Sequence, residues 1–263
     1  MGVQGLALIV ISVIAVSATA VATSTWNRAA RDSARAKAIM DGRAEIASMT
    51  AHEMRGPIST IRGLAATTSA HYNRLSDEER RELLGLIEQE SRRLMNTADQ
   101  ISLALKIDAA ALTLESTPVA LADVIRDGVA EADIGAHPIE VEAPQDLSVS
   151  CDRRWIGEVV HQLVDNAAKF SPPDSPIRIG GSRQAEHAVL EVLDEGPGIP
   201  VDKRQALFRK FPNWRPAGYE QQPGSGLGLF ICEALVAEHH GGISIEGGPA
   251  GGTILRIWLP VEG

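Results

Sequence analysis

The stretch LDEGPGIP, residues 193–200, decides the fold of the C-terminal half of this chain. Asp194 ends an apolar run and is followed by Gly196, Pro197 and Gly198. Glycines on both sides of a proline predict a turn whose backbone can come close to a flat ligand. We expect Asp194 to accept a hydrogen bond from an exocyclic amine such as that of adenine. An ordinary glycine turn is the alternative for this stretch taken alone.

A second glycine-rich stretch, GSGLGL, covers residues 224–229 and runs into an apolar helical pattern. Its glycines, Gly224, Gly226 and Gly228, favour a loop whose free backbone N–H groups and helix dipole face a phosphate. An ordinary glycine turn is again the alternative. In this order along the chain, however, the two stretches together predict a nucleotide pocket.

A third stretch, HQLVDNAAKFSP at residues 161–172, places three polar side chains on one helix. Lys169 follows Asp165 by four residues and Asn166 by three, and residues at these spacings share a helix face. An Asn oxygen is a good ligand for a Mg²⁺ ion that also holds phosphates, and a Lys one turn later neutralises their charge. Taken alone, the same composition also fits a solvated polar face at a helix end.

The residues around these motifs alternate between helical and strand patterns. Helical spacing predicts helices at residues 121–132, 155–170 and 228–239. Short apolar or alternating runs predict strands at residues 112–114, 138–141, 177–179, 188–193, 243–245 and 253–259. Residues 107–263 are therefore expected to form an α/β sandwich of mixed sheet and helices that contains the nucleotide pocket.

The stretch AHEMRGPIST, residues 51–60, brings an imidazole, a carboxylate and a helix breaker together. His52 and Glu53 lie off the apolar stripe of a helix that we expect to end near residues 71–75. Pro57 removes a backbone donor and is expected to bend the helix locally. A His-Glu pair on a helix is, by itself, usually an unremarkable surface feature.

A second helix is expected to follow at once, because Ser76 precedes three acidic residues, as in a helix N-cap and first turn. The two helices predict an all-α hairpin over residues 44–106, with one apolar face on each helix. Two such hairpins would bury these faces as a dimeric four-helix bundle, so we expect a homodimer. The alternative is that the hairpin packs on the rest of its own chain.

The N-terminus contains an uncharged apolar run from Gly5 to Thr23, long enough to cross a bilayer. Basic residues follow it, so the positive-inside rule predicts that the remainder of the chain is cytoplasmic. We therefore expect a single-pass transmembrane anchor at residues 1–25 and a juxtamembrane helix at 26–43, in the cytoplasmic membrane. A cleaved signal peptide is the alternative, but the positive segment expected before it is missing.

Composition excludes some classes of function. The net charge of −9 argues against nucleic-acid binding, which needs clustered Lys and Arg. The two cysteines, Cys151 and Cys232, are too few and too far apart to indicate a disulfide framework or a metal site.

With these motifs in this order, residues 44–262 resemble the membrane-bound sensor histidine kinases of two-component systems. The resemblance rests on a phosphoacceptor box (AHEMRGP), an Asn box (HQLVDNAAKFSP), two glycine boxes (LDEGPGIP, GSGLGLFI), a Phe box (LFRKF) and a closing strand (GGTILRIWLP). It implies a dimerisation and histidine-phosphotransfer domain followed by an ATP-binding domain of the gyrase-like ATPase superfamily.

The resemblance also implies a role for each matching residue. His52 would attack the γ-phosphate of ATP, and Glu53 would accept or orient its proton. The expected ligands of ATP and Mg²⁺ are Asn166 (metal), Lys169 (phosphate), Asp194 and Thr253 (adenine), Gly196 and Gly198 (adenine side), and Gly224, Gly226 and Gly228 (phosphate side). Residues 201–223, with Phe208 and Phe211, would form a mobile lid over the nucleotide.

The sequence departs from the family pattern at three places. Gly56 stands where the family usually has Thr or Asn to position the water that dephosphorylates the partner, so phosphatase activity by that route is in doubt. Gln162 replaces the first Asn of the Asn box but still offers an amide oxygen. The lid carries Pro212, Asn213 and Trp214 in place of more usual charged and aromatic residues.

The resemblance implies autophosphorylation of His52 and transfer of the phosphoryl group to an aspartate in the receiver domain of a response regulator. One alternative is a catalytically silent ATP-binding membrane scaffold that holds a response regulator. A second alternative is a gyrase-type ATPase that uses hydrolysis for conformational work, but such an enzyme has no need of the His-Glu hairpin.

Overall fold

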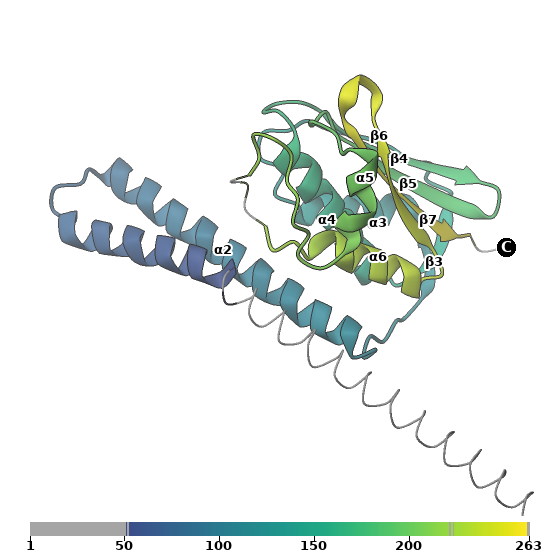
Figure 1. Ribbon diagram of the computed structural model, residues 1–263, viewed down its shortest axis with the longest axis horizontal. Helices are drawn as coiled ribbons and strands as arrows, with labels where there is room; N and C mark the ends of the chain where they lie inside the picture. The colour runs from purple at the N-terminus through teal and green to yellow at the C-terminus, as the bar shows by residue number, and fades with distance from the viewer. Residues whose placement is uncertain (1–50, 52, 221, 223, 262–263) are drawn as a thin grey trace, which may run out of the picture. The chain divides into compact units, whose positions relative to one another are not determined.

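The computed structural model describes residues 51, 53–220, 222 and 224–261 (Figure 1). The predicted membrane anchor and juxtamembrane helix, residues 1–43, lie outside the described residues, as does His52. Among the helices that are described, none combines the length and apolar character needed to span a membrane.

The predicted hairpin is present (Figure 1). One helix covers residues 53–71, and after a turn α2 runs over Asp77–Asp108. A capping box starts α2: the Ser76 hydroxyl accepts the Glu79 N–H at 3.2 Å, and the Glu79 carboxylate accepts the Ser76 N–H at 2.7 Å. These bonds satisfy two backbone donors at the helix start, so the signal recognised in the sequence fixes the end of the turn. Pro57 lies inside the first helix.

Apolar side chains of the hairpin remain uncovered by the rest of the described chain. Ile58, Leu84, Leu86 and Met95 are between 41% and 65% exposed. Only the last part of α2 packs on the following domain, whose core takes in Leu103 and Ala104. The alternative that the hairpin packs on its own chain therefore holds for this end of α2 alone.

The connector after α2 is fastened at both ends. The Ala111 N–H donates to the Lys106 carbonyl at 2.9 Å, and the Glu115 N–H donates to the Asp152 carboxylate at 2.9 Å. The strand predicted at residues 112–114 is wrong, because this segment forms no strand. Its two leucines are partly buried, and Leu112 packs against the core, so the apolar pattern arises from packing rather than from sheet pairing.

A mixed five-stranded sheet forms the second half, in the order β2 (Ile139–Glu142), β4 (Ile177–Gln184), β5 (His187–Leu193), β7 (Thr253–Pro260) and β6 (Gly242–Gly247). The β2–β4 pair is parallel and the others are antiparallel. Pairing of β5 with β7 puts Leu193 opposite Ile254, so Asp194 and Thr253 come together at the sheet end. The sheet thus assembles one side of the site from residues far apart in sequence.

Three helices cover one face of this sheet: α3 (Leu121–Glu131), α4 (Arg153–Phe170) and α6 (Gly228–Glu238) (Figure 1). Ile156, Leu163, Ile231, Leu235 and Ile257 are fully buried between the helices and the sheet. Ion pairs such as that of Arg256 with Glu191 and Glu246 occupy partly exposed strand positions. The predicted α/β sandwich is confirmed.

A small antiparallel pair, β1 (Thr117–Ala120) with β3 (Ser148–Cys151), was not predicted. Two short helices, α5 (Val201–Arg204) and η1 (Gln205–Phe208), follow β5, and η2 (Pro249–Gly251) joins β6 to β7. The lid region therefore begins with helical turns. Leu207 is buried, and Phe208 and Phe211 pack against the core, so the first part of the lid is held in place.

Candidate nucleotide and phosphotransfer site

The predicted adenine end of the site is built around the carboxylate of Asp194, just after β5. This residue is 5% exposed, and its Oδ1 accepts the N–H groups of Gly196 at 2.8 Å and Thr253 at 3.2 Å. Burial raises the pKa of the carboxyl, and the two backbone donors act against that rise. A buried carboxylate with lone pairs still available suits recognition of an amine.

Close backbone approaches explain the glycines at this end. A Cβ on Gly196 would lie 2.7 Å from the Phe170 carbonyl oxygen, and one on Gly198, whose φ is +70°, would lie 2.3 Å from that of Gly251. Gly252 was not singled out in the sequence, yet it has the tightest contact. A Cβ there would lie 1.9 Å from the Asp194 carbonyl oxygen. The same GGT motif, residues 251–253, from which Thr253 was predicted could also have indicated Gly252.

The phosphate end is formed by the loop that enters α6. Gly226 has φ of +67°, and its carbonyl accepts the Phe211 N–H at 3.0 Å. Leu227, the residue before α6, has no side-chain cap, whereas the Ser225 hydroxyl accepts the Leu227 N–H at 3.1 Å. The start of this eleven-residue helix thus offers backbone donors to an anion.

Asn166 and Lys169 reach this loop from α4. The Asn166 Nδ2 is 3.9 Å from where a Cβ of Gly228 would lie, and the Lys169 Nζ is 2.3 Å from that of Gly224. The amide and the ammonium therefore face the phosphate loop, and the missing side chains of the glycines leave room for the ligand. Asn166 and the phosphates would hold Mg²⁺, whose oxygen preference fits this amide.

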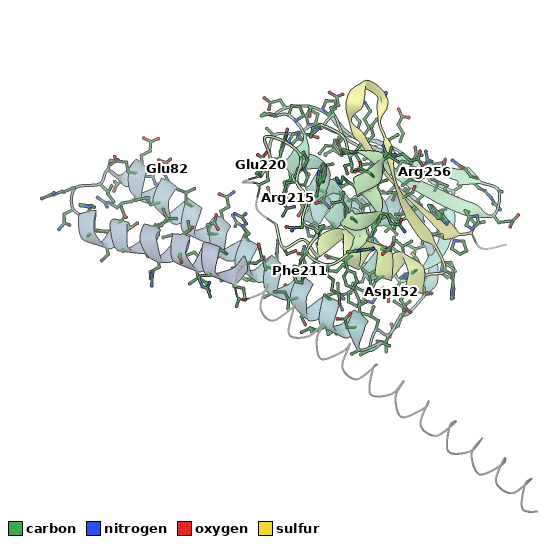
Figure 2. All side chains as sticks on the ribbon, viewed as in Figure 1. Glu82, Asp152, Phe211, Arg215, Glu220 and Arg256 are labelled. Atoms are coloured by element: carbon green, nitrogen blue, oxygen red, sulfur yellow. The ribbon has the colours of Figure 1, made fainter. Side chains whose placement is uncertain are left out.

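Two arginines add positive charge near Lys169, and neither was predicted. Arg215 in the lid (labelled in Figure 2) donates to the Gly224 carbonyl at 3.1 Å. Arg93 on α2 lines the same cavity. Burial, together with the positive charges of Arg215 and Arg93, lowers the pKa of Lys169 to about 8. Gathered cations of this kind suit a polyanion such as a triphosphate. Arg93 and Arg215 were not predicted because both are far in sequence from the Asn box.

An amide network joins this loop to the hairpin. The Gln100 Nε2 on α2 donates to the Gln162 Oε1 at 2.8 Å, and the Ser225 hydroxyl bonds the Gln100 Oε1. Gln162 also donates to Glu158 at 2.8 Å. Gln100 thus links α2 to the phosphate loop and to Gln162, the residue of α4 that departs from the family pattern. Gln100 carried no recognisable signal in the sequence.

Acidic residues surround a histidine beside the site. Glu131, Glu158 and His161 lie close enough together to suggest a metal centre. However, Asp165 and Glu158 bond the His161 ring and raise its pKa to about 10. A protonated imidazole has no lone pair to bind a metal. We therefore interpret this cluster as an ion pair. Asp165 also accepts the Asp133 N–H at 2.8 Å, so its role is structural.

One cavity is lined by eight of the predicted nucleotide ligands: Asn166, Lys169, Asp194, Gly198, Gly224, Gly226, Gly228 and Thr253. Gly196 does not line it and acts through its bond to Asp194. Glu53 from the first hairpin helix lines the same cavity, whereas His52 lies outside the described residues. Pro212 and Trp214, unexplained in the sequence, also line the wall.

Family models match both halves of the chain. Residues 43–110 match the His Kinase A (phospho-acceptor) domain, and residues 151–263 match the histidine kinase-, DNA gyrase B- and HSP90-like ATPase family. The first match contains His52, and the second contains all eight predicted nucleotide ligands that line the cavity.

Several known proteins are similar. The signal transduction histidine-protein kinase/phosphatase MprB of Mycolicibacterium vanbaalenii is 31% identical over 252 residues, covering 90% of this chain and 50% of the relative. A structure of mycobacterial sensor histidine kinase MprB is 30% identical with a TM-score of 0.50, covering 56% of this chain and 99% of that one. Histidine kinase ThkA, in complex with response regulator protein TrrA, is 25% identical with a TM-score of 0.61, covering 83% and 61%.

The chain spans only part of the length of its curated relatives. It covers 25%, 47% and 50% of three of them.

Proposed function

This chain belongs to the histidine kinase family, and we propose that it phosphorylates its own His52 from ATP and passes the phosphoryl group to an aspartate of a response-regulator receiver domain. The observation that carries the proposal is the single cavity that joins the nucleotide residues to Glu53, the chain neighbour of His52. A nucleotide pocket beside a phosphoacceptor segment is what autophosphorylation requires.

We infer the following roles in the reaction. Asp194 accepts the adenine amine with the Thr253 hydroxyl near the base, and the loop of Gly224–Gly228 with Lys169 and Arg215 binds the phosphates. Mg²⁺, when bound through Asn166, neutralises phosphate charge as the transition state forms. A ring nitrogen of His52 forms a bond to the γ-phosphorus while the bridging oxygen of ADP leaves. Glu53 accepts or orients the proton on the other nitrogen.

Glu53 is supported in this role by its position in the helix. Pro57, four residues later, has no N–H to bond the Glu53 carbonyl, so the helix is weakened at this residue. The side chain is partly buried, and its charge raises the pKa of Lys169. Glu53 therefore lies near Lys169, which binds phosphate, and next to His52 in the chain. This position suits a residue that accepts the His52 proton during phosphoryl transfer.

Incubation with γ-labelled ATP and Mg²⁺ tests this proposal. We expect an acid-labile, base-stable phosphate on the wild-type chain and none on His52→Gln, which still binds ATP. Labelling that persists in His52→Gln would contradict the assignment of the nucleophile. Tight ATP binding without any phosphoenzyme would favour the scaffold alternative.

We also propose a receiver domain and a second copy of this chain as partners. The complex of the relative ThkA with TrrA supports the first. The exposed Ile58, Leu84, Leu86 and Met95 of the hairpin support the second, because an apolar face needs a partner. Sedimentation of the purified chain should show a dimer, and Leu84→Glu with Met95→Glu should shift it toward the monomer.

We propose that residues 5–23 anchor the chain in the cytoplasmic membrane. Their uncharged apolar run and the basic residues after it support this. The full chain should remain with membranes after a carbonate wash, and deletion of residues 5–23 should release it. A chain that is released without the deletion would overturn the anchor.

A further inference from the structure

The ATP-binding domain is fixed to α2 of its own chain. Leu103 and Ala104 of α2 are 8% and 0% exposed, within the core of that domain. Gln100 is hydrogen-bonded to Gln162 and Ser225, and Asp108 forms an ion pair with Lys210. Apolar burial, amide bonds and an ion pair thus act on the last part of α2 together.

The connector reinforces this attachment. Its two ends are tied by the Ala111 and Glu115 backbone bonds, which leaves residues 112–114 between them. Three extended residues span roughly 10 Å. With Leu112 also packed against the core, this segment is too short to carry the domain to the far side of a helical bundle.

The hairpin places the phosphoacceptor segment close, along the helix axis, to the part of α2 that contacts the ATP-binding domain. The turn between the two helices is centred on residue 74, and Glu53 and Met95 are equally far from it in sequence. Glu53 is therefore expected to lie beside Met95 on α2. Met95 is five residues from Gln100, which is roughly 8 Å along a helix. Met95, Asn96 and Gln100 line the cavity together with Glu53, which agrees with this register.

Four residues of the first hairpin helix, Glu53, Gly56, Pro57 and Thr60, line the cavity that contains Asn166 and Lys169 of the same chain. Glu53 is close enough for its charge to act on Lys169. The nucleotide site of one chain therefore opens toward the phosphoacceptor helix of that chain.

We infer that the phosphoryl transfer proposed above occurs in cis, from the ATP bound by one chain to His52 of that same chain, even within a dimer. This inference rests on the proposed function but goes beyond it. The step itself is the same: a nitrogen–phosphorus bond forms at His52, and ADP leaves.

Heterodimers of differently tagged full-length chains, purified in detergent through both tags, test this inference. The first pairs a wild-type chain with a chain that carries both His52→Gln and Asn166→Ala. Transfer in cis labels the wild-type chain, at half the label per dimer of the wild-type homodimer. Transfer in trans leaves this heterodimer unlabelled, which would overturn the inference.

The second heterodimer pairs His52→Gln with Asn166→Ala. It should remain unlabelled in cis, whereas label on the Asn166→Ala chain would overturn exclusive transfer in cis. Asn166 is partly exposed, so its replacement should leave the fold intact.

The wild-type homodimer distinguishes a failure of the kinase proposal from a failure of the cis inference. If this homodimer takes no label, the kinase proposal itself fails. If the tagged chains do not associate and the wild-type monomer is labelled, transfer is in cis.

Discussion

The ammonium nitrogen of Lys169 lies 2.3 Å from the position that a Cβ of Gly224 would occupy. Lys169 on α4 and Gly224 in the phosphate loop are far apart in sequence but are thus in direct contact at the phosphate end of the site. The absence of a side chain at Gly224 is what allows Lys169 to face the loop.

Gly224→Ala should therefore weaken ATP binding while the fold is kept. The flexible end of Lys169 can swing away from the new methyl group, which costs little stability but removes a phosphate contact. Loss of one charge-assisted contact of about 1.4 kcal/mol raises the Kd roughly tenfold. Calorimetry measures the change. Gly63→Ala, an exposed position on the first hairpin helix with open space around its Cβ and no part in the cavity lining, is the control and should bind ATP as the wild type does.

Arg215→Ala should raise the KM for ATP roughly 10- to 100-fold, because a hydrogen bond from a charged donor contributes about 1.5–3 kcal/mol. Initial rates of autophosphorylation at varied ATP concentration measure this change. The matched control is Arg209→Ala, an exposed arginine of the same segment that does not line the cavity. Equal effects of the two replacements would show that Arg215 acts only through the net charge of the lid.

ATP binding should depend on pH through Lys169. Its pKa is lowered to about 8, so the free protein loses this cation as the pH rises through 8. Phosphates favour the charged form and raise the pKa in the complex, so ATP binding takes up protons above pH 8 and weakens there. Calorimetry in buffers of different ionisation enthalpy measures this uptake. In Lys169→Arg the uptake should disappear; its persistence would assign the proton to another group.

These expectations depend on what the sequence could reveal. Local signals were reliable: Ser76 with Glu79 marked the start of α2, and the glycine stretches marked both ends of the pocket. Contacts made across the fold left no such signal. Arg93, Gln100 and Arg215 enter the site only because α2, the lid and α4 converge.

Two elements differ from their predicted structure for the same reason. Residues 112–114 have the apolar spacing of a strand, but no partner strand lies beside them, and two backbone bonds hold the connector instead. The β1–β3 pair was missed because its strands are separated by α3 and β2. Short strands are defined by their partners more than by their own residues.

Gly56→Thr should create phosphatase activity toward the phosphorylated receiver domain. Nothing lies within 4 Å of a Cβ at this position, so a hydroxyl can be placed beside the phosphoacceptor segment. We expect dephosphorylation of the receiver to accelerate several-fold over the wild type, measured by loss of label from purified phosphoreceiver. Gly56→Ala is the matched control, since it places the same Cβ before Pro57 without the hydroxyl. An equal gain in both would show that the helix backbone, not the hydroxyl, is responsible.

The central claim is that His52 receives the γ-phosphate of ATP. The most direct test is site mapping of the phosphorylated full-length chain by mass spectrometry at neutral pH, after incubation with ATP and Mg²⁺. We expect a phosphoryl group on the peptide that contains His52 and Glu53, and its absence when Asn166 is replaced by Ala. Phosphate on a peptide with a different histidine, such as His71 or His161, or no phosphopeptide at all, would contradict it.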